Sequence, residues 1–286
     1  MTEPLLRIRN LRVWFPVGAA LFGKPAQLRA VDGVDFDLQA GEALGIVGES
    51  GCGKSTLARA ILRLVPSTAG QIVWMGQSIE GWSTRQVRPL RRDLQIVFQD
   101  PLASLDPRMT VGEIVAEPLR VHAPELSKAE RRERVADILR RVGLSPDVIN
   151  RYPHEFSGGQ CQRIGIARAM VLRPKLLVCD EPVSALDVSI QAQIVNLLQD
   201  LKRDFGMSIL FVSHNLAVVR KLCERVLVLY LGKPMELAPT EMLYSDPRHP
   251  YTRGLLAAVP IPDPAVQPLR LGTALGGELP SPLSPP

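Results

Sequence analysis

Residues 48–56 read Gly-Glu-Ser-Gly-Cys-Gly-Lys-Ser-Thr, and this stretch decides the fold of the chain. An apolar run at residues 43–47 predicts a strand before it, and residues 57–64 predict a helix after it. Glycines at this spacing turn backbone N–H groups toward an anion, and the helix N-terminus adds partial positive charge. The pattern therefore predicts a loop for nucleotide phosphates, with Lys54 on the β- and γ-phosphates and Ser55 on Mg²⁺. The alternative, a glycine-rich turn with an exposed lysine, would not require these flanks.

Composition sets broad limits on the class of protein. The chain has 286 residues, 46% hydrophobic and 22% charged, which suits one large or two small globular domains. No apolar run approaches a membrane span, and the first residues lack the apolar segment of a signal peptide. A net charge of +5 is compatible with nucleic acid or an anionic membrane surface. Most arginines are scattered, however, so an ordinary mildly basic surface is the favoured interpretation.

Cysteine usage indicates the redox compartment. The sequence contains no C-x-x-C pair, and its four cysteines are far apart: Cys52, Cys161, Cys179 and Cys223. This fits a reducing cytoplasm and argues against a metal site within this chain. Cys52 precedes a predicted helix, so it is either a thiol of lowered pKa or a small packing residue.

Strand and helix signals alternate along the chain, with a helical insertion in the middle. We expect further strands at residues 5–9, 34–38, 71–74, 94–98, 176–180, 208–212 and 225–230, and the last of these is the last good strand signal in the chain. Helices are expected at 110–121, 127–142, 161–172 and 188–205, with a short one after Pro239. Ser127 and Glu130 form a capping box, and Gly143 closes that helix. The Pro- and Gly-rich tail from Pro260 is expected to be extended.

Polar residues at element ends mark candidate chemistry. Asp180 and Glu181 stand at the end of a buried strand, where a cation would balance two adjacent carboxylates. Asp180 would hold Mg²⁺ through water. Glu181 would activate a water that attacks the γ-phosphate. Gln99 ends another strand and could reach a metal or water. His214, after a third strand, could contact a phosphate oxygen. The alternative for Asp180 and Glu181 is an ordinary surface turn, and the alternative for His214 is a purely structural histidine.

Residues 157–160, Ser-Gly-Gly-Gln, open a helix and form a second anion site without a lysine. Such a half-site makes sense if another chain supplies the rest of the pocket; a flexible helix cap is the alternative. Trp14 and Phe15 stand beside a predicted loop, where an aromatic ring can stack on a purine or simply pack in the core.

Together these motifs resemble those of the ATP-binding-cassette (ABC) ATPases over residues 5–260. The resemblance implies an α/β fold, a P-loop NTPase core with a mixed sheet, an antiparallel β-subdomain and an inserted α-helical subdomain. The implied division is 1–100 for the first part of the nucleotide-binding core with the antiparallel part and 101–160 for the helical subdomain. Residues 161–240 would form the second part of the core, and 241–286 a C-terminal extension with the Pro-rich tail.

The functional residues of the family carry over position by position. Phe15 matches the adenine-stacking aromatic, with Trp14 as the neighbouring alternative. The implied ATP-binding residues are Phe15, Gly48, Ser50, Gly51, Cys52, Gly53, Lys54, Ser55, Thr56, Ser157, Gly158, Gly159, Gln160 and Asp187. The implied catalytic residues are Glu181, His214 and Gln99, and the implied Mg²⁺ ligands are Ser55, Gln99 and Asp180. Phe156 replaces the usual Leu and Asn215 the usual Asp, both mild changes.

Longer phrases resemble those of the oligopeptide/dipeptide importer ATPases: residues 98–108, 151–156, 184–193 and 249–252. Importers of this family contain two different ATPases. The phrase at residues 98–108 resembles that of the second one. The resemblance implies a peripheral subunit on the cytoplasmic face of the inner membrane. Its partners would be two permease subunits and a second homologous ATPase, with a solute-binding protein acting indirectly and no nucleic acid. ATP would lie between the phosphate loop of one chain and residues 157–160 of the other.

In this family a tail similar to residues 276–282 often continues into a cysteine-rich segment that can hold an iron–sulfur cluster. No cysteine follows Cys223, so we expect no cluster in the chain as given.

Two rival functions come from other classes. A soluble ABC ATPase acting on nucleic acid usually carries two cassettes or a long coiled-coil insertion, and neither is present here. A non-hydrolysing regulatory cassette is disfavoured by Glu181 and His214. The cargo stays open among dipeptides, longer peptides, glutathione-like peptides and a nickel chelate. Family likeness favours two different ATPase chains over two copies.

Overall fold

A computed structural model describes residues 3–18 and 26–258, which form two compact units. Among the described residues, the first unit comprises residues 3–18, 26–39, 43–81 and 212–258. Its elements are β1 (Leu6–Val17), β2 (Ala26–Leu38), β3 (Ala43–Val47), α1 (Lys54–Ile61), β4 (Ala69–Trp74), β5 (Gln77–Ser78), α7 (Leu216–Leu222), β9 (Arg225–Tyr230), β10 (Lys233–Pro239), α8 (Thr240–Ser245) and α9 (Pro250–Ala257).

The second unit comprises Ala40–Glu42 and Trp82–Phe211. Its α-helices and strands are α2 (Thr84–Val87), β6 (Leu94–Val97), α3 (Val111–His122), α4 (Lys128–Arg141), α5 (Gly158–Met170), β7 (Leu176–Asp180), α6 (Val188–Phe205) and β8 (Ser208–Val212). Three 3₁₀ helices complete it: η1 (Arg88–Arg92), η2 (Pro146–Asn150) and η3 (Pro153–Glu155).

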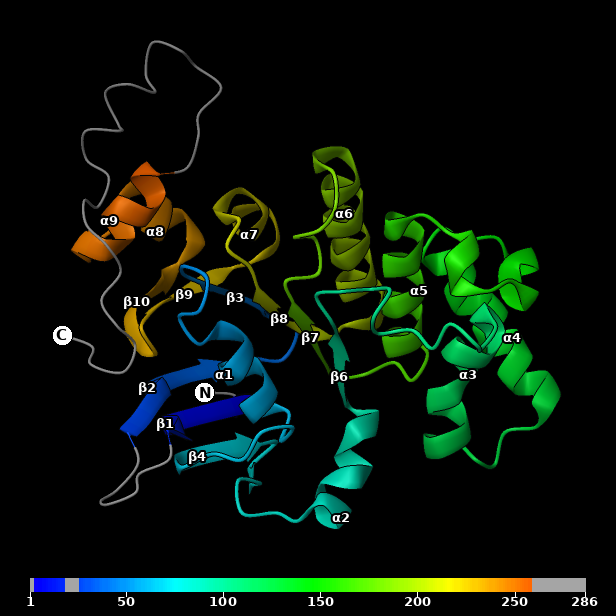
Figure 1. The fold of residues 1–286 in the computed structure, drawn as a ribbon, viewed down its shortest axis with the longest axis horizontal. Coiled ribbons are helices and arrows are strands. Elements are labelled where there is room, and N and C mark those ends of the chain that lie inside the picture. Colours follow the sequence, from blue (N-terminus) through cyan, green and yellow to red (C-terminus); the bar gives the residue numbers. More distant parts are fainter. Residues whose placement is uncertain (1–2, 19–25, 259–286) are drawn as a thin grey trace, which may run out of the picture. The chain divides into compact units, whose positions relative to one another are not determined.

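An antiparallel sheet in the first unit has the strand order β2-β1-β4-β5, so that β1 lies between β2 and β4 (Figure 1). Leu6 pairs with Leu38 and Ile8 with Phe36, and all four side chains are buried. The register then shifts after Ile8, which marks an irregularity in the ladder. Because side chains alternate across a strand, this register turns one apolar face of both strands toward the core.

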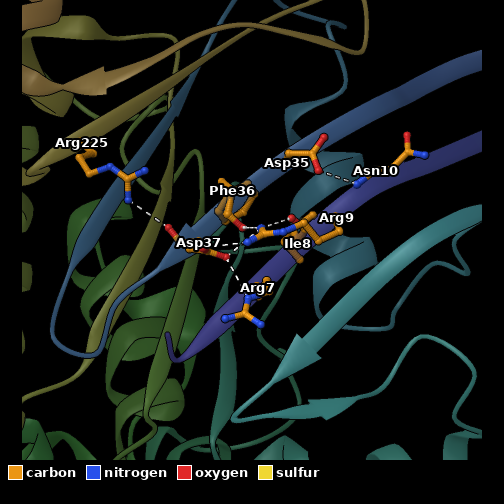
Figure 2. Close-up of polar contacts among 8 residues, drawn as sticks. All are labelled: Arg7, Ile8, Arg9, Asn10, Asp35, Phe36, Asp37 and Arg225. Carbon is orange, nitrogen blue, oxygen red and sulfur yellow. Dashed lines mark hydrogen bonds and ion pairs between the residues drawn. The ribbon is translucent and has the colours of Figure 1, made fainter. Parts of the chain in front are cut away.

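Asp37 ties the end of β2 to two other strands (Figure 2). Its carboxylate accepts a hydrogen bond from Arg9 Nη2 at 2.9 Å, and Arg7 Nε lies 3.5 Å from Oδ1. Arg225 of β9 donates from Nη1 to the Asp37 carbonyl at 3.0 Å. The ion pairs are partly exposed, so their role is mainly to fix register.

The first unit also contains a mixed strand arrangement. Strand β9 lies between β10, its antiparallel neighbour, and β3, its parallel neighbour. Gly45 pairs with Val226 and Val47 with Val228. All five residues of β3 are buried, as expected of a strand covered on both faces.

The second unit combines parallel strands with packed helices. Strands β8, β7 and β6 lie in that order, and β6 and β7 are parallel, with Val97 opposite Cys179. Helix α3 packs on both α4 and α5. The predicted capping box opens α4: the Ser127 hydroxyl accepts the N–H of Glu130, whose carboxylate accepts the N–H of Ser127.

Element prediction was correct for the buried strands and differed from the structure at several other elements. Strands β3, β7, β8 and β9 and helix α6 have the expected bounds. Strand β9, the last good strand signal in the sequence, is followed by a further strand, β10, that was not predicted. Helix α1 starts at Lys54 rather than at residue 57, and β1 continues to Val17 rather than ending at residue 9. Strand β2 starts at Ala26 rather than at residue 34, and helix α5 starts at Gly158 rather than at residue 161. The tail from Pro260 lies outside the described residues.

Membrane-spanning capacity was searched over the part of the chain that the structure describes. No helix there is both long and apolar enough to cross a bilayer.

Phe211, at the end of the second unit, provides a test of its core. It is the largest side chain that is fully buried, with 0% exposure. We expect Phe211→Ala to lower the free energy of unfolding by about 3–5 kcal/mol, because it leaves a cavity, and Phe211→Leu to cost about 1 kcal/mol. Urea titration followed by circular dichroism measures both. Met75→Ala, at a half-exposed position, is the control, and an equal loss there would contradict the assignment of Phe211 to the core.

Candidate functional site

The predicted phosphate loop connects the buried strand β3 to helix α1 within the first unit. Gly48, Gly51 and Gly53 all have positive φ values, of 151°, 80° and 101°. A Cβ at Gly53 would lie 1.9 Å from the Ala30 carbonyl oxygen, so no side chain fits there. Glycine is therefore required both for backbone conformation and for the close approach to β2.

Lys54 lies inside this loop rather than in solvent. It is 3% exposed, and its ammonium donates to the carbonyl oxygens of Gly48 at 2.9 Å and Glu49 at 2.8 Å. A buried ammonium must be compensated by such acceptors. The loop thus holds a cation at the N-terminus of α1, where an anion would be favoured.

Cys52 does not have the lowered pKa that its position before a helix allowed. Burial raises the pKa of the Cys52 thiol, while the Lys54 ammonium acts in the opposite direction without overcoming it. The side chain is 3% exposed. Of the two interpretations, the structure supports a small packing residue.

His214 and the two candidate aromatic residues belong to the same unit as the loop. Ser213 donates its N–H to the Ile46 carbonyl at 3.1 Å, which places the exposed His214 beside the strand that leads into the loop. Asn215 caps α7 by accepting from the N–H of Ala217 at 3.1 Å, so the amide performs this capping as a carboxylate would. Phe15 is half-buried in β1.

Trp14, the alternative to Phe15, already has cationic neighbours. The guanidinium carbon of Arg29 lies 4.9 Å from the indole centroid, and that of Arg12 lies 5.7 Å away. These cation–π contacts occupy ring surface that a purine would need. They favour Phe15 over Trp14 as the stacking residue.

Gln99 and Glu181 are brought together in the second unit. Because β6 and β7 are parallel with Val97 opposite Cys179, the residues that follow them meet at one edge. Gln99 Nε2 donates to Glu181 Oε2 at 3.3 Å. Asp180, the last residue of β7, is fully buried.

Glu181 has a left-handed backbone, with φ of 50°. Such a conformation is strained for a residue with a long side chain and is characteristic of functional sites. The turn that follows stabilises it, since Ser184 donates from both its N–H (3.3 Å) and its hydroxyl (3.1 Å) to the Glu181 carbonyl.

The serine of the 157–160 segment caps helix α5. The Ser157 hydroxyl accepts the N–H of Gln160 at 3.4 Å, and Gln160 Oε1 accepts the N–H of Ser157 at 3.0 Å. Ser157, Gly158 and Gln160 are exposed. The helix start is therefore preformed and accessible on the surface of this unit.

Asp187 lies close to this segment. A Cβ on Gly158 would be 3.7 Å from Leu186, and one on Gly159 would be 2.7 Å from Ile190. Asp187 is the N-cap of α6, but its carboxylate makes no cap hydrogen bond to that helix. Val188, the next residue, is 82% exposed.

The predicted site residues thus fall into two sets. The first unit holds Phe15, Gly48, Ser50, Gly51, Cys52, Gly53, Lys54, Ser55, Thr56 and His214; the second holds Gln99, Ser157, Gly158, Gly159, Gln160, Asp180, Glu181 and Asp187. Among the described residues, no group of three or more His, Cys, Asp or Glu side chains could by itself hold a metal ion.

Sequence reasoning missed the residues far along the chain that contact the phosphate loop, and Tyr251 is one of them. Tyr251 of α9 accepts a hydrogen bond from the N–H of Glu49 at 3.3 Å. The phrase at residues 249–252 was noticeable in the sequence, but nothing in it indicated a contact with residues about 200 positions earlier.

Comparison with known proteins decides the family. The ABC transporter family matches residues 31–184, and the family described as "Oligopeptide/dipeptide transporter, C-terminal region" matches residues 235–286. The chain is 58% identical over 285 residues to OppF, an oligopeptide transport ATP-binding protein of Escherichia coli, covering 99% of this chain and 85% of the relative. This chain belongs to that family of ABC ATPases.

Other relatives agree with this family assignment. DppF of Pseudomonas aeruginosa, a di/tripeptide transport ATP-binding protein, is 53% identical over 286 residues, covering 99% of this chain and 87% of the relative. A solved dimer of the ATP-binding cassette MJ0796 with ADP and phosphate is 29% identical, with a TM-score of 0.74, covering 82% of this chain and 98% of that one. The resemblance and the predicted α/β P-loop fold are thus confirmed.

The raised pKa of Cys52 yields a testable prediction for this ABC ATPase. Alkylation needs the thiolate. When the pH lies below the pKa, the thiolate fraction falls about tenfold for each further pH unit. We expect iodoacetamide at pH 7 to modify Cys52 at least about tenfold more slowly than glutathione, with the rate still rising above pH 9. Peptide mass spectrometry of the folded chain measures this. Modification of Cys52 as fast as glutathione, with a rate that levels off below pH 8, would indicate a lowered pKa instead.

Proposed function

We propose that this chain is one of two ATPase subunits that drive import of di- and oligopeptides through a membrane permease. The observation that carries the proposal is the Glu181 carboxylate at the end of β7, held by Gln99 from the neighbouring strand. Together with the phosphate loop, it supplies both nucleotide binding and activation of water. The chemistry is that of an ABC ATPase, and the cargo class follows from the names of the relatives.

Nucleotide binding would be an exchange of hydrogen bonds at Lys54. Its ammonium leaves the carbonyl oxygens of Gly48 and Glu49 and binds the β- and γ-phosphates, while loop and α1 N–H groups bind the remaining oxygens. Phe15 would stack on adenine. Because the ammonium is already buried and positioned, little reorganisation is required.

The donor set fits Mg²⁺. The Ser55 hydroxyl, the Gln99 amide oxygen and the buried Asp180 carboxylate are the hard oxygen ligands that this ion prefers. When bound, Mg²⁺ would neutralise charge on the phosphates.

Hydrolysis would then use Glu181 as the base. A water attacks the γ-phosphorus, its proton passes to the Glu181 carboxylate, and the bond from phosphorus to the β–γ bridging oxygen breaks to give ADP and phosphate. Gln99 holds the carboxylate in place, and His214 would donate to a γ-phosphate oxygen. Positioning and charge stabilisation are the main requirements of phosphoryl transfer.

A second ATPase chain would complete each site. Ser157, Gly158, Gly159, Gln160 and Asp187 would bind the nucleotide held by the partner. The exposure of Ser157, Gly158, Gln160 and Asp187 and the preformed start of α5 support this role. We favour a partner of different sequence over a second copy.

The helical segment, residues 101–160, would form with Gln99 a groove for coupling helices of the membrane permease, whose two subunits are the expected membrane partners. A hollow of about 300 Å³ between α3, α4 and η2, together with the half-exposed Leu102 and Val121, supports a docking surface there. The chain would thus be peripheral on the cytoplasmic face of the membrane. A solute-binding protein on the other side would select the cargo, and nucleic acid would have no role.

Glu181→Gln separates binding from turnover. We expect ATP affinity within about twofold of wild type, because the amide keeps the shape of the side chain, and turnover at least about 100-fold lower, because it cannot accept a proton. Lys54→Ala should instead weaken ATP binding itself. Isothermal titration with MgATP and a phosphate-release assay measure the two effects. Wild-type hydrolysis in Glu181→Gln would remove Glu181 from its proposed role.

Assembly tests the partner proposal. We expect hydrolysis by the isolated chain to rise at least about tenfold when the second ATPase and the permease are added in membranes, because each site lacks its second half until then. Equal activity of the isolated chain would show that it builds complete sites alone. The same assembly built with the Ser157→Arg chain is the control. If the nucleotide held by the second ATPase contacts this serine, its hydrolysis rate should stay near that of the isolated chain.

A further inference from the structure

The C-terminal extension reaches the phosphate loop through one buried phenol. Tyr251 of α9 is 6% exposed, and its oxygen accepts the N–H of Glu49 at 3.3 Å. Both residues lie within the first unit. The contact connects a segment outside residues 31–184, which match the ABC transporter family, to the phosphate loop inside that range.

The phenol is held in place by a series of contacts. The Tyr251 ring lies 4.5 Å from that of Tyr230 on β9, centroid to centroid. At the start of α9, His249 Nδ1 accepts the N–H of Tyr251 at 3.1 Å. The Glu236 carboxylate accepts the N–H groups of Arg248 and His249, both at 3.0 Å. The start of α9 is therefore anchored to Glu236 of β10, and this anchor positions Tyr251 beside the loop.

Tyr251 and Lys54 hold the same peptide unit from opposite ends. The unit between Gly48 and Glu49 presents its carbonyl to the Lys54 ammonium, at 2.9 Å, and its N–H to Tyr251. The ammonium has three N–H donors, so when Lys54 turns to phosphate it holds this carbonyl with fewer of them or releases it. Gly48 has the conformational freedom to let the unit rotate, with φ already at 151°. The Tyr251 bond does not depend on where the ammonium lies.

We propose that Tyr251 is a positioning residue for nucleotide binding, which keeps the Gly48–Glu49 peptide in its phosphate-binding orientation while Lys54 moves to the nucleotide. The proposal rests on the assignment of residues 48–56 as the nucleotide site. Without the phenol oxygen, the loop samples rotated orientations, and ATP must select the competent one. The loss therefore appears in affinity more than in the chemical step.

The test compares two phenols of the same extension. Tyr251→Phe keeps the ring and its packing but removes the acceptor. Tyr244→Phe is the matched control, because the Tyr244 hydroxyl donates to the Leu216 carbonyl, away from the loop. We expect Tyr251→Phe to raise the Kd for MgATP about three- to tenfold, the effect of one hydrogen bond, and to raise KM with kcat within about twofold. Tyr244→Phe should leave the Kd unchanged.

Hydrogen–deuterium exchange of the full chain gives a second readout. The peptide that contains residues 48–53 should exchange faster in Tyr251→Phe than in wild type, and not in Tyr244→Phe. An unchanged Kd and exchange rate in Tyr251→Phe would overturn the proposal, as would equal changes in both variants, which would indicate a general loss of stability.

Two further variants keep the outcome decisive. Should Tyr251→Phe fail to fold, His249→Ala loosens the start of α9 and should weaken MgATP binding in the same direction; wild-type affinity there would overturn the proposal. Lys54→Ala is titrated in parallel. Unchanged affinity in Lys54→Ala would refute the nucleotide site itself, whereas weak binding there with wild-type binding in Tyr251→Phe refutes only the role of Tyr251.

Discussion

A close approach of three backbones shapes the phosphate loop. Gly53 lies against the Ala30 carbonyl of β2, and Gly232, in the turn between β9 and β10, lies against the same strand. Gly232 donates its N–H to the Cys52 carbonyl at 2.9 Å and accepts the N–H of Asp32 at 2.8 Å. This arrangement is available only where two residues lack side chains. The geometry of the loop therefore depends on β2 and on the β9–β10 turn as much as on its own sequence.

Strands that are buried throughout were predictable, because continuous apolar runs of five or six residues admit few alternatives. Strand β10 was not, since Pro234 and Pro239 argue against a strand, and only its place beside a single partner makes them tolerable. The bounds of β1 were underestimated because the simple alternation of apolar and polar residues ends near residue 9, where the register with β2 shifts. Helix α1 was expected to start later, since its first residues are also the polar end of the phosphate motif.

The candidate site shows the same division between local and long-range information. Residue identities and spacing predicted the phosphate loop and both carboxylates. They could not predict the left-handed backbone of Glu181, which depends on the turn after it, or the burial that raises the pKa of Cys52. The contact of Tyr251 with Glu49 was equally out of reach, because it depends on how β10 and α9 pack beside the loop.

The cap of helix α5 has a consequence for how strongly two such chains would hold each other. In the free chain the Ser157 hydroxyl also lies 3.3 Å from Gln160 Oε1, to which it donates. To reach a phosphate on a neighbouring chain, it would have to surrender that bond. When the chains associate through this serine, its hydroxyl exchanges one hydrogen-bond acceptor, Gln160, for another, the phosphate. The net free energy of that exchange is small. A contact of this kind favours a pair of subunits that separates readily once the phosphate has gone.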